Sequence, residues 1–181
     1  MGHSLGGAVA AWLAARTPQR VAALVLAAPA ADTRSLTGLD HLLAAPVIGD
    51  VLSAAVLGAA GGAAAIRPVR PFLGARLRLD PDYLRSSAGM LLNPRAWRSF
   101  VADQRMLIRE LPELERRLGE IVAPTTVVAG TADRIVPLAS AREAAQRIRG
   151  ATLIELQGAH HLLHQQRPAE LAEVIVAAAG L

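Results

Sequence analysis

The sequence predicts an α/β fold in which helices cover a parallel sheet and a helical segment interrupts it. A serine flanked by glycines, Gly2-x-Ser4-x-Gly6, comes directly before an Ala-rich stretch typical of a helix. Later, the short continuous apolar run Val21–Ala28 has the pattern of a strand buried on both faces of a parallel sheet. Two further strands are predicted, a β-branched one at Thr125–Ala129 and another at Thr152–Leu156.

The Gly-x-Ser-x-Gly pattern predicts a nucleophile elbow, a tight turn between a strand and a helix that carries a reactive serine. We expect a strained backbone at Ser4, with Gly2 and Gly6 avoiding a collision across the turn. The helix should run from Leu5 to Thr17, and His3 should pack beneath the elbow. No strand is visible before Ser4.

The middle of the chain predicts a helical cap, which divides the protein into a core of residues 1–32, a cap of residues 33–118 and a core of residues 119–181. Helices should start at Asp80-Pro81-Asp82 and at Asn93-Pro94. A separate surface helix is expected at Leu111–Leu118. We expect the apolar stretch Asp40–Ile66 to form buried cap helices, because its longest uncharged part is too short for a membrane span. Membrane contact through the cap is the alternative.

After Pro124 the alternation of strand and helix returns. The sequence predicts a helix at Ser140–Arg149 with Gly150 as its C-cap, and a final amphipathic helix at Pro168–Ala179.

Composition excludes several functions. The nineteen basic residues are all Arg and are scattered, and no basic stripe with aromatic residues is present, so we expect no nucleic-acid partner. Without cysteine, there is no disulfide and no thiolate metal site or nucleophile. No signal peptide is visible, and we predict a cytoplasmic protein.

An acid and a base follow two of the predicted strands, so they should share one edge of the sheet with Ser4. Asp133 lies in the loop after Thr125–Ala129, and Asp32 after the first strand is the alternative acid. His160 and His161 compete for the role of base after the third strand. Serine, acid and histidine in this order match one known order of the catalytic triad.

These motifs resemble the C-terminal portion of an α/β-hydrolase-fold serine hydrolase, from Gly2 to Leu181. The resemblance implies that Ser4 is the nucleophile, His161 the base and Asp133 the residue that orients it. His161 is preferred over His160 because the family pattern is Gly-x-Gly-His followed by apolar residues. The backbone N–H of Leu5 would donate to the oxyanion.

The resemblance also implies strands before the elbow and a second oxyanion donor from an upstream loop. Their absence from the sequence leads us to hypothesise a truncated reading frame, in which Val21–Ala28 is an exposed apolar edge. We expect an esterase or lipase acting on a small, apolar acyl substrate, weakly active or inactive as a truncated chain. The alternative is a non-catalytic fragment or interaction protein that docks through an open sheet edge.

No cofactor or metal is expected. His160 and His164 have a spacing that could bind a metal on a helix, but no acidic residue lies between them. The oligomeric state is not predicted by the sequence.

Overall fold

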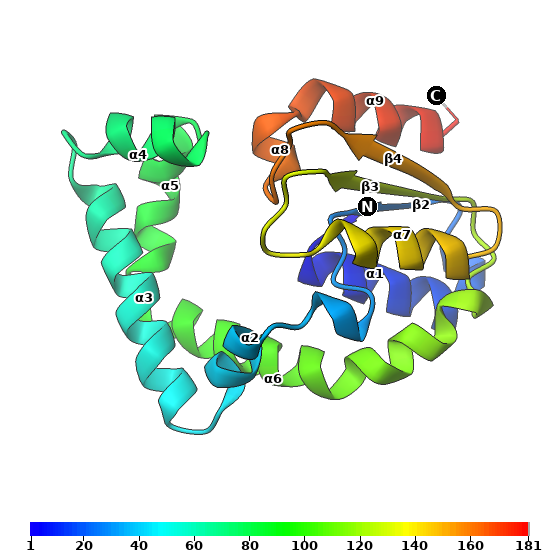
Figure 1. The fold of residues 1–181 in the computed structure, drawn as a ribbon, viewed down its shortest axis with the longest axis horizontal. Coiled ribbons are helices and arrows are strands. Elements are labelled where there is room, and N and C mark those ends of the chain that lie inside the picture. Colours follow the sequence, from blue (N-terminus) through cyan, green and yellow to red (C-terminus); the bar gives the residue numbers. More distant parts are fainter. Residues whose placement is uncertain (181) are drawn as a thin grey trace. The chain divides into compact units, whose positions relative to one another are not determined.

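A computed structural model describes residues 1–180 of the chain. Within these residues four strands alternate with helices, and the sequence predicted three of the four (Figure 1). The strands are β1 Gly2–His3, β2 Leu24–Ala27, β3 Thr125–Gly130 and β4 Thr152–Leu156. The helices are α1 Leu5–Arg16, α2 Gly38–Ala44, α3 Ile48–Ala65, α4 Arg70–Leu77, α5 Pro81–Leu91, α6 Pro94–Arg117, α7 Leu138–Arg147, α8 Leu163–Gln166 and α9 Pro168–Ala178.

The chain forms two compact units. The first contains residues Met1–Thr37 and the chain from Leu107 onward, and it holds the sheet. The second, Gly38–Met106, is helical. Helix α6 begins in the second unit and ends in the first.

The four strands are parallel and lie in the order β1-β2-β3-β4. This confirms the predicted α/β fold with a parallel sheet. Because all strands point the same way, the loops that leave β1, β3 and β4 emerge at one edge of the sheet.

Alternate side chains of the strands enter two separate hydrophobic clusters. Leu24 and Leu26 of β2 pack on one face with α1, α7 and the end of α6. Val25 and Ala27 pack on the other face with α8 and α9. Figure 1 shows α1 and α7 on one side of the sheet and α9 on the other. Burial on both faces explains why β2 is a continuous apolar run rather than an alternating one.

Two expectations about the start of the sheet are corrected. Gly2 and His3 themselves form a short strand, pairing with Leu26 and Ala27, so the turn at Ser4 is held by a strand within the chain. The side chains of β2 are not exposed either, because Leu24 and Val25 are buried between the helices of the two faces.

Two helix predictions are wrong in detail. The segment Leu111–Leu118 is not a separate surface helix: its first seven residues continue α6, and Leu111, Leu114 and Leu118 are fully buried. Gly150 is not the C-cap of α7, which ends at Arg147 with Ile148 as its cap. Gly150 does have a positive φ of 71°, so it forms the turn into β4.

The second unit is a set of packed helices. A small core of Ala64, Leu84 and Ala88 joins α3 to α5. Arg105 of α6 donates to the carbonyl of Ala44 and to the Asp50 carboxylate, 2.8 Å away. The predicted helix start at Asp80 is confirmed, because its carboxylate caps α5 by accepting from two backbone N–H groups.

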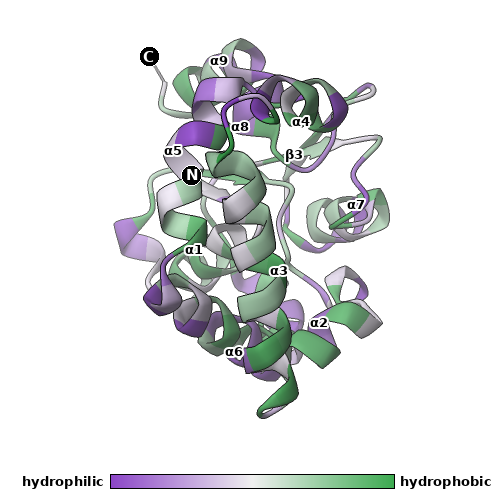
Figure 2. Cartoon of the chain, turned by 90° about the vertical axis from the view of Figure 1, so that its left-hand side faces the viewer, coloured by the Kyte–Doolittle hydropathy of each residue, from purple (hydrophilic) through white to green (hydrophobic). Residues whose placement is uncertain are grey.

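Helix α3 is long and apolar enough, by length and composition alone, to cross a membrane. Most of α3 is green or pale in Figure 2, the colours of apolar and intermediate residues. The prediction of buried cap helices is wrong for this segment, because only 22% of α3 is buried and Val51 and Val56 are exposed. The predicted domain boundaries and the cap's membrane contact both stay predictions.

Candidate active site

Ser4 lies at the junction of β1 and α1 in a strained backbone conformation. Its φ is 53° and its ψ is −122°, a region that a residue with a side chain rarely adopts, at a cost of about 1–3 kcal/mol. The backbone around it is held firmly: Ser4 N donates to the carbonyl of Ala27, and Ser4 O accepts from the N–H groups of Gly7 and Ala30. This confirms the strain predicted for the elbow.

The glycines of the motif do not have equal roles. A Cβ on Gly2 would lie 2.1 Å from the carbonyl oxygen of Gly6, so only glycine fits there. A Cβ on Gly7 would lie 2.9 Å from the side chain of Pro29. A Cβ on Gly6 would meet no atom within 4 Å, and the expected steric role of Gly6 is therefore wrong. The close contacts belong to Gly2 and Gly7.

The loop carrying Asp133 and the loop carrying His161 lie against each other. Thr131 N donates to the carbonyl of Leu156, and Ala132 N donates to that of Ala159. A Cβ on Gly130 would lie 2.2 Å from the carbonyl oxygen of Ala159, so the contact needs glycine at the end of β3.

These loops bring three predicted residues into one hydrogen-bonded chain. His161 Nδ1 lies 2.8 Å from Asp133 Oδ2, and His161 Nε2 lies 3.0 Å from Ser4 Oγ. Because an ionised carboxylate only accepts, His161 donates through Nδ1–H. Nε2 then has a lone pair for the Ser4 hydroxyl. The arrangement can activate a serine as a nucleophile.

Asp133 is held as a charged group although its side chain is only 2% exposed. Burial would raise its pKa, but the hydrogen bond from His161 and those from the N–H groups of Ile135 and Val136 outweigh it and keep the pKa below 3.8. A buried carboxylate that stays ionised can orient an imidazole and stabilise its protonated form.

The alternative acid, Asp32, and the alternative base, His160, have other bonding partners in the structure. Asp32 is fully buried and accepts a hydrogen bond from the hydroxyl of Ser140, while its other oxygen lies 4.0 Å from Arg34 Nε. His160 is anchored through its backbone N–H, which donates to the side-chain amide of Gln166. The geometry therefore brings Asp133 and His161 together, whereas Asp32 contacts Ser140 of α7.

Leu5 is the first residue of α1, where a backbone N–H has no acceptor within the helix. Such an N–H, next to the serine, can donate a hydrogen bond to a negatively charged oxygen. The second oxyanion donor expected from an upstream loop stays a prediction.

Sequence reasoning missed one contact in the site. His3 does pack beneath the elbow, but it also lies with Nε2 2.8 Å from the main-chain oxygen of His161. No sequence motif marks this contact, because it joins residues at opposite ends of the chain. Within residues 1–180, no group of three His, Cys, Asp or Glu side chains could hold a metal ion.

A serine on a strained strand–helix turn, bonded to a histidine–carboxylate pair at the carboxyl edge of a parallel sheet, defines a hydrolase-like site. A model of the alpha/beta hydrolase family matches residues 1–174, and the chain belongs to this family.

Comparison with individual proteins supports the same family. The human (Homo sapiens) monoglyceride lipase is 30% identical over 172 residues, covering 93% of this chain and 52% of that protein. The structure of a hydrolase from Pseudomonas aeruginosa PA01 is 27% identical with a TM-score of 0.70, covering 99% of this chain and 63% of that one. The enol-lactonase of Burkholderia xenovorans LB400 shares the fold, with 22% identity and a TM-score of 0.61 over 99% of this chain and 64% of that one. The chain thus spans about half the length of the curated relative it matches.

Proposed function

We propose that this protein is a serine hydrolase of the esterase or lipase type, which cleaves an ester or related acyl bond through an acyl-enzyme. The observation that carries the proposal is the continuous chain of hydrogen bonds from Ser4 through His161 to Asp133.

In this proposal each step of the reaction is assigned to one group of the site. The Ser4 hydroxyl passes its proton to His161 Nε2 as Oγ attacks the acyl carbon. The resulting oxyanion accepts from the N–H of Leu5, and Asp133 stabilises the imidazolium. His161 returns the proton to the departing alcohol. Water then attacks the acyl-enzyme by the same route, releasing the acid and restoring Ser4.

The substrate proposed is an uncharged ester with an apolar acyl chain. The relationship to monoglyceride lipase supports a glycerol ester in particular. A panel comparing a monoacylglycerol, short-chain nitrophenyl esters and a lactone would rank these classes by kcat/KM. The cytoplasmic location and the expectation of no nucleic-acid partner stay predictions.

The proposal is tested with a fluorophosphonate probe, which labels activated serines. Ser4→Ala should abolish labelling and ester hydrolysis. The matched control is Ser99→Ala, which removes an exposed serine of α6 and should label like the wild type. Labelling that persists in Ser4→Ala would refute the assignment of the nucleophile.

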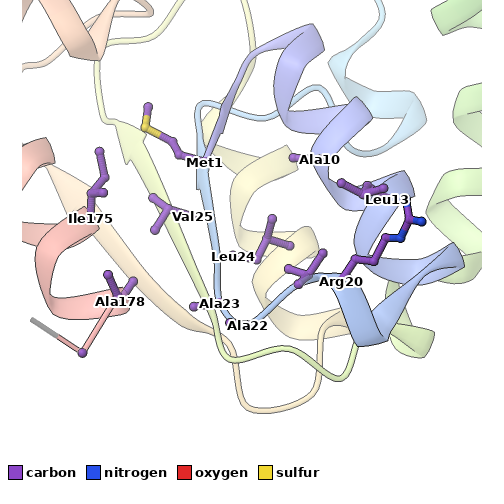
Figure 3. A pocket seen from close by; sticks show the side chains of 13 residues that line it. Met1, Ala10, Leu13, Arg20, Ala22, Ala23, Leu24, Val25, Ile175 and Ala178 are labelled. Atoms are coloured by element: carbon purple, nitrogen blue, oxygen red, sulfur yellow. The ribbon is translucent and has the colours of Figure 1, made fainter.

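A groove beside β2 favours a second candidate function, an interaction protein that receives an extended peptide. The groove has a volume of about 630 Å³ and lies between α1, the first half of β2 and α9 (Figure 3). Most of its lining is apolar, including Leu13, Val25 and Ile175, and it continues the line of the β1–β2 pairing. A soluble, monodisperse chain without hydrolytic activity that binds an apolar peptide would favour this function.

A further inference from the structure

Three histidines lie together behind the nucleophile, but the proposed reaction uses only His161. The ring of His3 lies 4.8 Å from the ring of His161 and 4.9 Å from that of His164, measured between ring centres. His3 directly precedes Ser4 on β1, and His164 belongs to α8.

The contact between His3 and His161 has a defined direction. His3 Nε2 lies 2.8 Å from the main-chain oxygen of His161, and a carbonyl oxygen can only accept. His3 must therefore carry a proton on Nε2. The residue next to the nucleophile thus binds the main chain of the residue that acts as its base.

The surroundings keep His3 uncharged near neutral pH. Burial lowers its pKa below 6.5, the hydrogen bond to His161 opposes this shift, and the nearby His161 and His164 lower the pKa further, with a smaller opposing effect from Asp133. Burial and then His161 also lower the pKa of His164. A neutral His3 can donate this hydrogen bond without placing a positive charge beside a base that must accept a proton.

We propose that His3 is a positioning residue, which holds the main chain of His161 so that its Nε2 stays within reach of Ser4 Oγ. The inference rests on the proposed function. In this role His3 acts through His161 and not on the substrate itself. His3 couples the position of the nucleophile to that of the base. Because β1 leads directly into Ser4 and its His3 is bonded to the main chain of His161, a shift of β1 would move Ser4 and His161 together.

The kinetic test compares His3→Leu with His3→Gln at about pH 8, above the ordinary pKa of a histidine side chain. His3→Leu removes the donor and should lower kcat by about 10- to 100-fold with little change in KM, as expected when a reacting group is misplaced by a fraction of an ångström to an ångström. His3→Gln keeps a side-chain N–H at similar reach and should recover most of the loss. The control is His41→Gln, an exposed histidine of α2, which should leave kcat unchanged.

If His3 had a purely structural role, His3→Leu and His3→Gln would lower kcat equally, and that result would overturn the proposal. A His3→Leu variant with the kcat of the wild type would overturn it as well. A spectroscopic test needs no variant: side-chain spectra of the protein labelled with ¹⁵N-histidine should show His3 as the neutral Nε2–H form at about pH 7. The Nδ1–H form would overturn the inference.

Failure of this inference differs from failure of the proposed function. If Ser4→Ala abolishes probe labelling while His3→Leu is fully active, only the role of His3 is wrong. If Ser4→Ala is still labelled, the serine hydrolase assignment itself is wrong.

Discussion

Asp133 directs its two carboxylate oxygens to different partners, which makes it a rigid support for His161. Oδ1 accepts from the backbone N–H groups of Ile135 and Val136, and Oδ2 lies 2.8 Å from His161 Nδ1. The backbone contacts fix the carboxylate, and the carboxylate fixes the tautomer of His161.

Asp133→Asn should therefore lower kcat by about 10⁴-fold, the size of effect seen when an amide replaces the acid of a triad. An amide that presents its NH₂ group to His161 favours the tautomer with the proton on Nε2, which cannot accept the proton of Ser4. The measurement is kcat for a chromogenic ester.

Asp32→Asn is the matched control for this prediction, since Asp32 is the other acid that follows a strand. Its contacts with Ser140 and Arg34 stabilise the fold, so the substitution should lower the free energy of unfolding but leave kcat near that of the wild type. A large loss of kcat in Asp32→Asn, with none in Asp133→Asn, would reverse the assignment of the acid.

The junction of β1 and α1 depends on the close approach of two backbone segments. The carbonyl of Gly6 lies where a Cβ of residue 2 would be, at 2.1 Å, whereas position 6 opens onto free space. The motif therefore contains one glycine that the turn requires and one that it tolerates.

Gly2→Ala and Gly6→Ala test this difference. Gly2→Ala must displace the first turn of α1, so it should lower the melting temperature and abolish labelling of Ser4 by the probe. Gly6→Ala should retain labelling and increase the free energy of unfolding by about 0.4–1 kcal/mol, because alanine leaves the unfolded chain fewer conformations than glycine does. Thermal unfolding and labelling of both variants provide the comparison; similar losses in the two would contradict it.

At the scale of elements, buried strands were predictable and the packing of α6 was not. The continuous apolar run Val21–Ala28 predicted a strand buried on both faces, and β2 has that burial. The other two predicted strands also form, but β4 lies at the edge of the sheet and is only partly buried. The sequence predicted a separate surface helix at Leu111–Leu118, but Pro112 lies inside the continuous helix α6. The helix stays continuous because Leu111 and Leu114 are buried in the core. The free energy gained by this burial outweighs the loss of one backbone hydrogen bond at the proline.

At the scale of the whole molecule, parallel strands explain why the candidate site could be predicted from residues far apart in sequence. Loops after parallel strands meet at one edge, so Ser4, Asp133 and His161 were expected to converge. Contacts set by exact side-chain reach, such as that of His3 with the main chain of His161, have no sequence signature. The same is true of the approach of Gly130 to Ala159.

The ionisable groups of the site also make the stability of the whole fold depend on pH. His3 and His164 have pKa values below 6.5 in the fold, so the unfolded chain binds protons first as the pH falls. Stability is therefore lost from about 6.5 down through the folded pKa values. Asp133 has its pKa lowered from 3.8, so it stabilises the fold above that value and this contribution is lost as the pH falls through its folded pKa.

The two histidines and Asp133 all make the fold less stable at lower pH. We therefore expect the urea midpoint to fall on acidification in two separate pH windows. The first, below about pH 6.5, should shrink in the double variant His3→Gln, His164→Gln, because glutamine does not titrate. The second, at about pH 4 and below, should persist in that variant and diminish in Asp133→Asn. Urea titrations at a series of pH values give the midpoints. A wild-type midpoint that stays constant between about pH 8 and pH 5 would contradict the lowered pKa values of the two histidines, since their neutral forms would then have no advantage in the fold.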